Sequence, residues 1–153
     1  MQIELTLALP RDTVSVPVAR RVCTEAMEAL GVDDDCAHDI EIALTEACTN
    51  VLEHVADGDE YAVAVHIGGT VCVIEVTDTG RGFDHVSLHD PVAEPTAERG
   101  RGLAIMNALV DRVRFTSRSE SGTICHLEKA LVWTEDAPAR ELTDDAPAPA
   151  GGA

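Results

Sequence analysis

The sequence lacks any apolar run approaching the roughly 18 residues that a membrane-spanning helix needs. Its first residues, Met1 to Glu4, also lack the basic segment and following apolar stretch of a secretory signal peptide. We therefore expect a cytoplasmic protein that neither crosses a membrane nor is exported.

Basic residues are scarce. Lysine and arginine number 11 against 28 aspartates and glutamates, which gives a formal net charge of −17 at pH 7. A field of this sign repels the phosphates of nucleic acids and the head groups of anionic lipids. The composition therefore disfavours direct nucleic-acid binding and binding to a membrane surface.

Cysteine pairs with metal-ligand spacing are absent, because none of the cysteines forms a C-x-x-C motif. An odd number of cysteines in a chain that is not exported indicates reduced thiols, most of them buried, rather than a disulfide framework or a zinc site. The five are Cys23, Cys36, Cys48, Cys72 and Cys125.

Length and composition favour one globular domain. The chain has 153 residues, of which 45% are hydrophobic and 25% charged, and this is ordinary globular usage. We assign residues 1–133 to the domain. Residues 134–153 contain three prolines, six alanines, five acidic residues and one basic residue without periodicity, so we expect a disordered acidic tail rich in alanine and proline.

Two helices are predicted after an N-terminal strand at residues 2–9. The first spans about 15–30, with Ser15 as N-cap, Gly31 as the stop and an apolar stripe of Val18, Val22, Ala26 and Leu30. The second begins at Asp33, Asp34 and Asp35, whose negative charge suits a helix N-terminus, and runs to about Val55. Its apolar stripe is Ile40, Leu44, Ala47 and Val51.

Strands are predicted at 61–67 and 70–77, joined by a tight turn at Gly68 and Gly69. The second of these is apolar on both faces, which indicates a central strand. A short helix at 103–110 and strands at 112–118 and 123–132 follow. This order favours an α+β two-layer sandwich, with a mixed, mostly antiparallel sheet and helices on one face.

A long segment without regular periodicity, residues 78–101, interrupts this pattern. Glycines and prolines break both the helical and the strand period there. Irregular segments of this length inside a compact domain are usually functional or disordered.

The first candidate functional segment is Glu46 to Asn50, within the second predicted helix. Glu46 and Asn50 lie one turn apart on the same flank of that helix, beside its apolar stripe. They are therefore placed to line the edge of a cleft. An ordinary solvated flank is the alternative for this pair taken alone.

The second segment runs from Asp78 to Phe83, directly after the central strand. Two glycines, Gly80 and Gly82, permit close approach of a ligand to the backbone, and the Asp78 carboxylate can accept a hydrogen bond from an amine. A simple turn leaving the strand is the alternative.

The third segment, Arg99 to Leu103, leads into the short helix. Its glycines, Gly100 and Gly102, would expose backbone N–H groups to an anion beside the positive end of the helix. This is not a Walker motif, because G-x-x-x-x-G-K-[ST] is absent.

In this order the three segments resemble the N-box and the two glycine boxes of the GHKL ATPases, and most closely those of the anti-sigma factor serine kinases of the RsbW type. The N-box pattern E-x-x-T-N-x-x-x-H is matched by Glu46, Thr49, Asn50 and His54. The first glycine box is matched by Asp78, Gly80, Gly82 and Phe83. The second is matched by Gly100, Gly102, Leu103, Ile105, Met106, Leu109, Val110 and Asp111, and a later Gly-Thr pair by Gly122 and Thr123.

The resemblance covers about residues 3–132 and implies a Bergerat-type ATP site. In that site Asp78 would recognise the adenine amine, Asn50 would hold Mg²⁺, and Glu46 would be the general base. A flexible lid would cover the phosphates between Phe83 and Gly102. The further residues expected to contact ATP are Gly80, Gly82, Phe83, Arg99, Gly100, Arg101, Gly102, Leu103 and Thr123.

The function implied by the resemblance is that of a protein serine/threonine kinase acting as an anti-sigma factor. It would phosphorylate an anti-sigma factor antagonist, a STAS-domain protein, and would bind a sigma factor. A homodimer is compatible with the resemblance, although the sequence marks no interface.

Two other functions are alternatives to the kinase and anti-sigma factor function. An ATP-binding interaction module without kinase activity is the main alternative, but such a module has no need of a base at Glu46. A detached catalytic domain of a histidine kinase is disfavoured by the spacing from Glu46 to Asn50 and by the short lid region.

Overall fold

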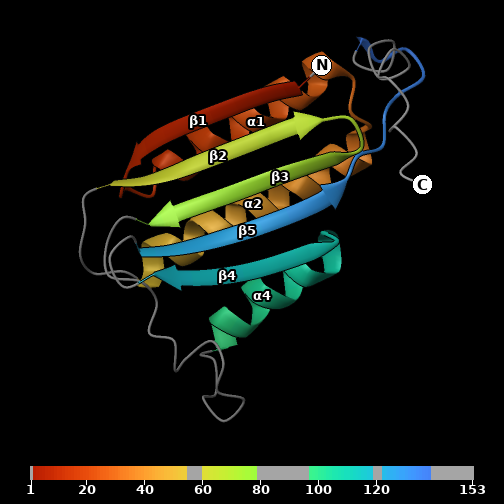
Figure 1. Ribbon diagram of the computed structural model, residues 1–153. Coiled ribbons are helices and arrows are strands. Elements are labelled where there is room, and N and C mark those ends of the chain that lie inside the picture. The colour runs from red at the N-terminus through yellow and green to blue at the C-terminus, as the bar shows by residue number, and fades with distance from the viewer. Residues whose placement is uncertain (1, 55–59, 79–96, 119–121, 139–153) are drawn as a thin grey trace, which may run out of the picture.

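The computed structural model describes residues 2–54, 60–78, 97–118 and 122–138, and the rest of the chain lies outside the described residues. Eight elements follow one another along the chain (Figure 1). They are β1 (Gln2–Pro10), α1 (Ser15–Leu30), α2 (Asp34–His54), β2 (Glu60–Gly68), β3 (Val71–Asp78), α4 (Ala97–Leu109), β4 (Arg112–Arg118) and β5 (Gly122–Ala130).

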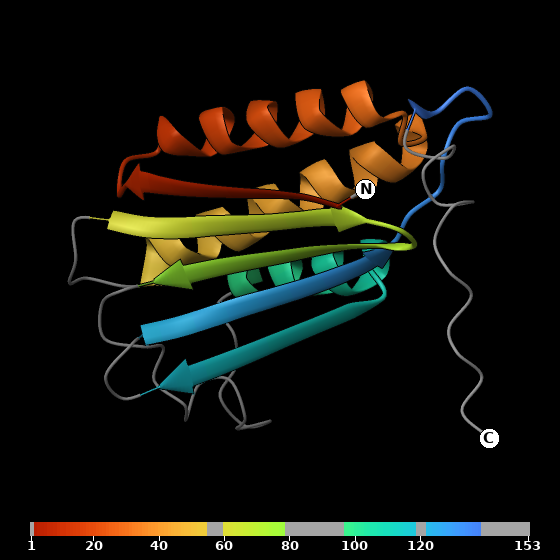
Figure 2. The same cartoon turned by 45° about the horizontal axis from the view of Figure 1, so that its top comes forward.

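The strands form one five-stranded sheet in the order β1-β2-β3-β5-β4, with β3 at its centre as predicted. The three helices lie on one face of the sheet, so the α+β two-layer architecture is confirmed (Figures 1 and 2). Each described strand pair is antiparallel, and the expected mixed component of the sheet is wrong. The reason is that β5, and not β4, lies beside β3. The strand β5 runs antiparallel to both of its neighbours, whereas β4 beside β3 would have formed a parallel pair.

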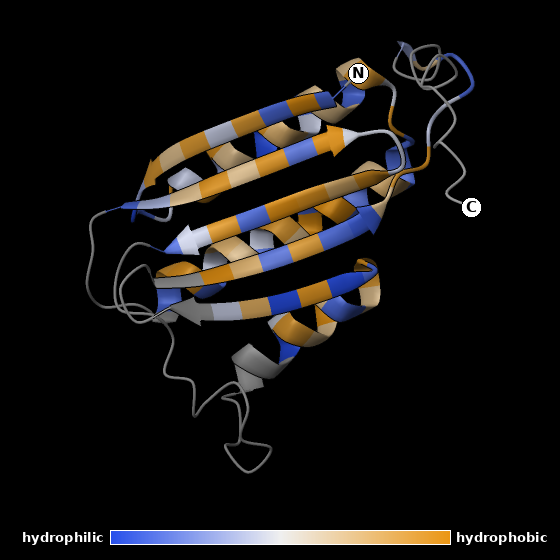
Figure 3. Ribbon diagram, in the orientation of Figure 1, coloured by the Kyte–Doolittle hydropathy of each residue, from blue (hydrophilic) through white to orange (hydrophobic). Residues whose placement is uncertain are grey.

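The core lies between the sheet and the helices. Strand residues alternate between buried and partly exposed positions, and Figure 3 shows the same alternation in hydropathy along the ribbons. The predicted stripe of α2 is confirmed, because all four of its residues are buried. Burying an aliphatic side chain of this kind stabilises the fold by about 1.5–3 kcal/mol.

The predicted stripe of α1 is out of phase with the observed one. Val18 is 48% exposed, whereas Cys23 and Met27 are buried. Residues spaced by four advance 40° per step around a helix, so a run of such steps drifts away from one face. The observed stripe keeps an average spacing near 3.6 residues and consists of Val16, Ala19, Cys23, Met27 and Leu30.

The start of α1 also differs from the prediction. The N-cap is Val14, and Ser15 makes no capping bond. Instead, the Ser15 hydroxyl donates to the carbonyl oxygen of Asp12 at 2.6 Å and shares a 2.5 Å hydrogen bond with the hydroxyl of Tyr61 on β2. Ser15 therefore anchors the helix to the sheet. Gly31 ends the helix as predicted, with a φ of 84° that disfavours other residues.

The β2–β3 turn is shifted by one residue from the prediction, because Gly68 still belongs to β2 and the turn is formed by Gly69 and Thr70. Gly69 has a φ of 59°. Its carbonyl oxygen accepts a 3.0 Å hydrogen bond from the indole N–H of Trp133. The chain after β5 is thereby fastened to this turn.

Residues 134–138, which we assigned to the tail, belong to the ordered structure. Ala137 is only 2% exposed, and a Cβ on Gly31 would lie 2.5 Å from the Ala137 Cβ. The backbone N–H and the hydroxyl of Thr134 both donate to the carbonyl oxygen of Gly31. The expected disordered segment is therefore reduced to residues 139–153, which lie outside the described residues.

The five cysteines are free and buried, as predicted. Burial raises the pKa of the Cys23 thiol to about 11 and those of Cys48, Cys72 and Cys125 to about 12. Thiols of this kind are poor nucleophiles at neutral pH.

We expect these thiols to weaken the fold at alkaline pH. In the unfolded chain they ionise near pH 9, while in the folded chain they stay protonated up to about pH 11 or 12. Their contribution to stability is present below pH 9 and is lost as the pH rises above it. Between pH 9 and the raised pKa of each thiol, that thiol should lower the free energy of unfolding by about 1.4 kcal/mol for each unit of pH.

Urea unfolding at pH 8, 9 and 10 measures this effect. The variant Cys23→Ala should show a shallower fall than the unaltered chain, because it has one thiol fewer. A free energy of unfolding that stays constant from pH 8 to 10 would contradict the prediction.

No helix among the described residues is both long and apolar enough to cross a membrane.

Candidate functional site

Asp78 is the last residue of the central strand, as predicted, and it is 0% exposed. It faces the helix layer, because its neighbours at alternate positions along β3 are buried on that side. A buried carboxylate is costly unless other groups compensate its charge. The Nη1 atom of Arg11 lies 3.7 Å from the Asp78 Oδ1 atom and provides an opposite charge.

Arg11 follows β1 directly, and its side chain is only 9% exposed. In addition to its ion pair with Asp78, its Nη2 atom donates a 2.7 Å hydrogen bond to the carbonyl oxygen of Val51 on α2. Val51 is the residue after Asn50. The guanidinium therefore connects the buried carboxylate of β3 with the segment of α2 that carries the predicted site residues.

Sequence reasoning missed Arg11. The signal that could have found it is the strand register, in which Leu9 pairs with Tyr61 and Tyr61 pairs with Asp78. The end of β1 and the end of β3 thus lie at the same end of the sheet. That register depends on pairing between distant segments, and local patterns do not reveal it.

Glu46 and Asn50 are both partly buried on one flank of α2, as predicted. The helix α4 packs against α2, and Gly102 is one point of contact. A Cβ added to Gly102 would lie 3.0 Å from the Glu46 Oε2 atom and 3.4 Å from the Asn50 Oδ1 atom. The structure therefore brings together two of the three predicted segments.

The position of Gly100 and Gly102 corrects the sequence prediction. Both were expected to precede the helix, but α4 begins at Ala97 and includes them. The backbone N–H groups without an intrahelical partner are the first four of a helix, so here they belong to residues 97–100. Gly102 has another role, because the absence of a side chain lets Glu46 and Asn50 approach α4.

The remaining predicted site residues fall into two groups. Arg101 and Leu103 are exposed on α4, and Thr123 lies in β5. The side chains of Arg99 and Thr123 lie outside the described residues, as do Gly80, Gly82, Phe83 and most of the expected lid. The part of the expected lid that is described, residues 97–101, is helical.

Oxygen donors for a divalent cation are present at this site. The Glu46 Oε2 and Asn50 Oδ1 atoms both lie near Gly102 of α4, at 3.0 Å and 3.4 Å from the position that a Cβ there would take. Carboxylate and amide oxygens are the protein ligands that Mg²⁺ accepts, usually one or two of them together with substrate phosphates. The residues present therefore fit a magnesium–nucleotide ligand.

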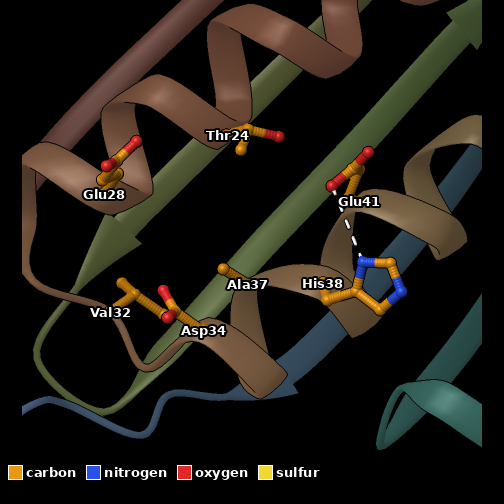
Figure 4. A pocket seen from close by; sticks show the side chains of 7 residues that line it. All are labelled: Thr24, Glu28, Val32, Asp34, Ala37, His38 and Glu41. Carbon is orange, nitrogen blue, oxygen red and sulfur yellow. Dashed lines mark ion pairs between the residues drawn. The ribbon is translucent and has the colours of Figure 1, made fainter.

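A separate groove of about 230 Å³ lies between the C-terminal part of α1 and the N-terminal part of α2 (Figure 4). It contains three carboxylates, and in it the His38 Nδ1 atom lies 3.9 Å from the Glu41 Oε2 atom. Negative charge makes this groove unsuitable for phosphates. The residues that line it are Thr24, Glu28, Val32, Asp34, Ala37, His38 and Glu41.

The face of the sheet opposite the helices carries a charged cluster centred on His126. Its ring nitrogens contact the Glu75 Oε1 atom at 3.0 Å and the Glu128 Oε1 atom at 2.9 Å. The hydrogen bond from His126, with a smaller contribution from the charge of Arg112, lowers the pKa of Glu128. This cluster is on the other side of the sheet from Asp78 and does not belong to the same site.

Comparison with known proteins matches the chain to a family and to individual relatives. The family model described as "Histidine kinase-like ATPase domain" matches residues 9–129, a range that contains every predicted site segment. The chain is 31% identical over 138 residues to a protein named Serine-protein kinase RsbW from Halalkalibacterium halodurans, covering 84% of this chain and 83% of that one.

Further matches agree with this result. A Serine-protein kinase RsbW from Bacillus cereus strain AH820 is 27% identical over 122 residues, covering 73% of this chain and 76% of that one. The crystal structure of the RsbU and RsbW domains of a Mycobacterium tuberculosis protein superimposes with a TM-score of 0.65 at 23% identity. That match covers 84% of this chain and 32% of the other, and it supports the fold.

Proposed function

Because the chain belongs to the histidine kinase-like ATPase family, we propose that it is an ATP-dependent protein serine/threonine kinase that acts as an anti-sigma factor. The observation that carries the proposal is the approach of Gly102 to Glu46 and Asn50 on α2, the helix that Arg11 links to the buried Asp78 at the end of the central strand. The names of its relatives, serine-protein kinases, support the same reaction class.

The adenine end of the site is proposed at Asp78. Its buried carboxylate can accept a hydrogen bond from the exocyclic amine of adenine in a desolvated setting, where such a bond is strong. Gly80, Gly82 and Phe83, which follow Asp78 in the sequence, are proposed as further contacts of the nucleotide. Thr123 on the neighbouring strand β5 would contact the same end of the nucleotide.

The phosphate end of the site is proposed between α2 and the start of α4. The free N–H groups at residues 97–100 and the positive end of the helix favour anions. Arg99 and Arg101 would add positive charge, while Leu103 would pack beside the nucleotide.

Asn50 would hold Mg²⁺, which when bound offsets part of the negative charge on the phosphates. Glu46 lies one helical turn away and is proposed as the general base. It would accept the proton of a serine or threonine hydroxyl as that oxygen bonds to the γ-phosphorus and the bond to ADP breaks.

The proposed partners are a sigma factor and an anti-sigma factor antagonist of the STAS-domain type, which would supply the hydroxyl. Binding and silencing of the sigma factor would alternate with phosphorylation of the antagonist. We also propose that the chain forms a homodimer. The alternative, a nucleotide-dependent binding module without kinase activity, is less well supported because Glu46 is present.

Incubation with radiolabelled ATP and candidate antagonist proteins, followed by phosphoamino-acid analysis, tests the function. Labelled phosphoserine or phosphothreonine on an antagonist is the expected result. Nucleotide binding without transfer to any antagonist would favour the binding module, and labelled phosphohistidine would favour a histidine kinase domain.

We expect Gly102→Ala to lower phosphoryl transfer while leaving the fold intact. The added Cβ would meet the Glu46 carboxylate at 3.0 Å, so the end of this flexible side chain must shift. A misplacement of about 1 Å in a reacting group can cost roughly 10²-fold in rate, and the shift of a few tenths of an ångström needed here should cost less, about several-fold. Alanine is itself about 1 kcal/mol better than glycine inside a helix, so stability should not fall.

Single-turnover transfer and thermal unfolding measure the two effects. The matched control is Asn107→Ala on an exposed position of α4, which should change neither the rate nor the fold. Unchanged transfer by Gly102→Ala would show that the close approach of α4 to Glu46 is not needed.

A further inference from the structure

We propose that Arg11 is the positioning residue for purine recognition: it holds the Asp78 carboxylate in place for the 6-amino group of adenine. This inference rests on the proposed function, because it concerns the same nucleotide site. It starts from a buried cation that neither the motifs of the sequence nor the family comparison assigns to the site.

The backbone of Arg11 is placed by the end of β1, and its side chain is placed by contacts with α2 and β3. The β1 strand ends at Pro10, and its final pairs with β2 bring it to the end of the sheet where β3 also ends. The Arg11 side chain then turns into the molecule, since only 9% of it is exposed. It reaches Val51 on α2 with one terminal nitrogen and approaches Asp78 with the other.

The chemistry of the guanidinium group explains how Arg11 can position the Asp78 carboxylate in addition to neutralising its charge. The group is planar and rigid and keeps its charge at all physiological pH values. With Nη2 bonded to the Val51 carbonyl oxygen at 2.7 Å, the position of Nη1 beside the Asp78 Oδ1 atom is set by α2. The charge that faces the carboxylate is therefore held in place by the helix that carries Glu46 and Asn50.

A purely structural role for Arg11, as a tie between β1 and α2, makes a different prediction. Such a tie would affect the binding of every nucleotide that needs a folded site. A residue that positions Asp78 for the amine would affect only ligands that carry the amine. The comparison of ATP with purine riboside 5′-triphosphate, which differs from it by this amine alone, separates the two roles.

The experiment measures the dissociation constants of both magnesium nucleotides by calorimetry, for the unaltered full-length chain and for Arg11→Met. Methionine keeps an unbranched stem of similar volume and removes the charge and the donors. The unaltered chain should bind ATP about tenfold or more tightly than the analogue, since the lost bond involves an ionised group. In Arg11→Met the affinity for ATP should fall about tenfold, and that for the analogue less than about twofold.

Two further variants complete the test. Arg11→Lys keeps the charge but cannot serve both neighbours through a rigid fork, so it should restore only part of the preference for ATP. If Arg11→Met does not fold, the preference of Arg11→Lys for ATP over the analogue provides the test instead. The matched control is Arg112→Met, which removes an arginine whose side chain is 52% exposed and pairs with Glu128 across β4 and β5. This control should leave both dissociation constants unchanged.

The outcomes are distinguishable. A preference for ATP that is lost in Arg11→Met and partly restored in Arg11→Lys supports the proposal. Equal weakening of both nucleotides, or a preference that survives in Arg11→Met, overturns the role of Arg11 and leaves the proposed function standing. If the unaltered chain binds both nucleotides equally well or binds neither, the adenine site at Asp78 fails, and the role of Arg11 fails with it.

Discussion

Replacing Glu46, the proposed general base, by glutamine is expected to lower phosphoryl transfer to the proposed antagonist by about 10²- to 10⁴-fold, the usual contribution of such a group. Glutamine keeps the shape and the hydrogen-bonding capacity of Glu46 but cannot take up a proton at neutral pH. The neighbouring Gly102 leaves room for the side chain in either form. The affinity for nucleotide should therefore change little.

Rapid-quench measurement of transfer, with calorimetric titration of ATP beside it, separates the rate from the affinity. Asn50→Ala provides the contrast, because it should weaken the part of nucleotide binding that depends on magnesium. If Glu46→Gln transfers phosphate to a genuine acceptor at the normal rate, Glu46 is not the base, and the binding-module alternative gains support.

The second large effect is expected from Asp78→Asn. The change removes a buried negative charge and can place an N–H donor opposite the adenine amine, which is itself a donor. It also removes the charge that faces Arg11 at 3.7 Å. A buried mismatch of this kind costs about 1–3 kcal/mol, which corresponds to roughly a 5- to 150-fold loss of affinity for ATP.

Calorimetric titration with ATP measures the loss, and thermal unfolding shows how much of it reflects a weaker fold. Glu75→Gln is the matched control, since Glu75 lies on the same strand but on the opposite face of the sheet. It should bind ATP normally. An Asp78→Asn variant that is folded and binds ATP as tightly as the unaltered chain would remove Asp78 from the site.

Local patterns predicted the parts of the fold that strong periodicity determines. The stripe of α2 was correct because large aliphatic residues at helical spacing leave one choice of buried face. The stripe of α1 was out of phase because valine was counted as core while Cys23 and Met27 were not. Both of these side chains are buried, and Val18 is not.

The start of α4 could not be predicted from propensity alone. Gly100 and Gly102 lower the helical propensity of their segment, and both were interpreted as part of a loop. Tertiary packing overrides this preference, since the missing side chain at Gly102 lets α4 lie close to Glu46 and Asn50. Gly102, which the sequence pattern places just before the helix, lies within α4 and permits its close approach to α2.

The candidate site was predictable where a residue's own neighbours in sequence determine its place. Asp78 follows a run of residues that is apolar on both faces, so its position at the end of a central strand was evident. Arg11 was not predictable, because its neighbours Val51 and Asp78 come from distant parts of the chain. Only the antiparallel register of β1, β2 and β3 brings them together.

The order of the strands also has a consequence for how a newly made chain reaches its native state. The central strand β3 completes its hydrogen bonding only when β5, the last strand of the sheet, is inserted between β3 and β4. Pairing between distant segments slows folding. Until it occurs, Ile74 and Val76 border an open strand edge, which is a template for association with other chains. A growing chain is therefore vulnerable to aggregation until β5 has been synthesised.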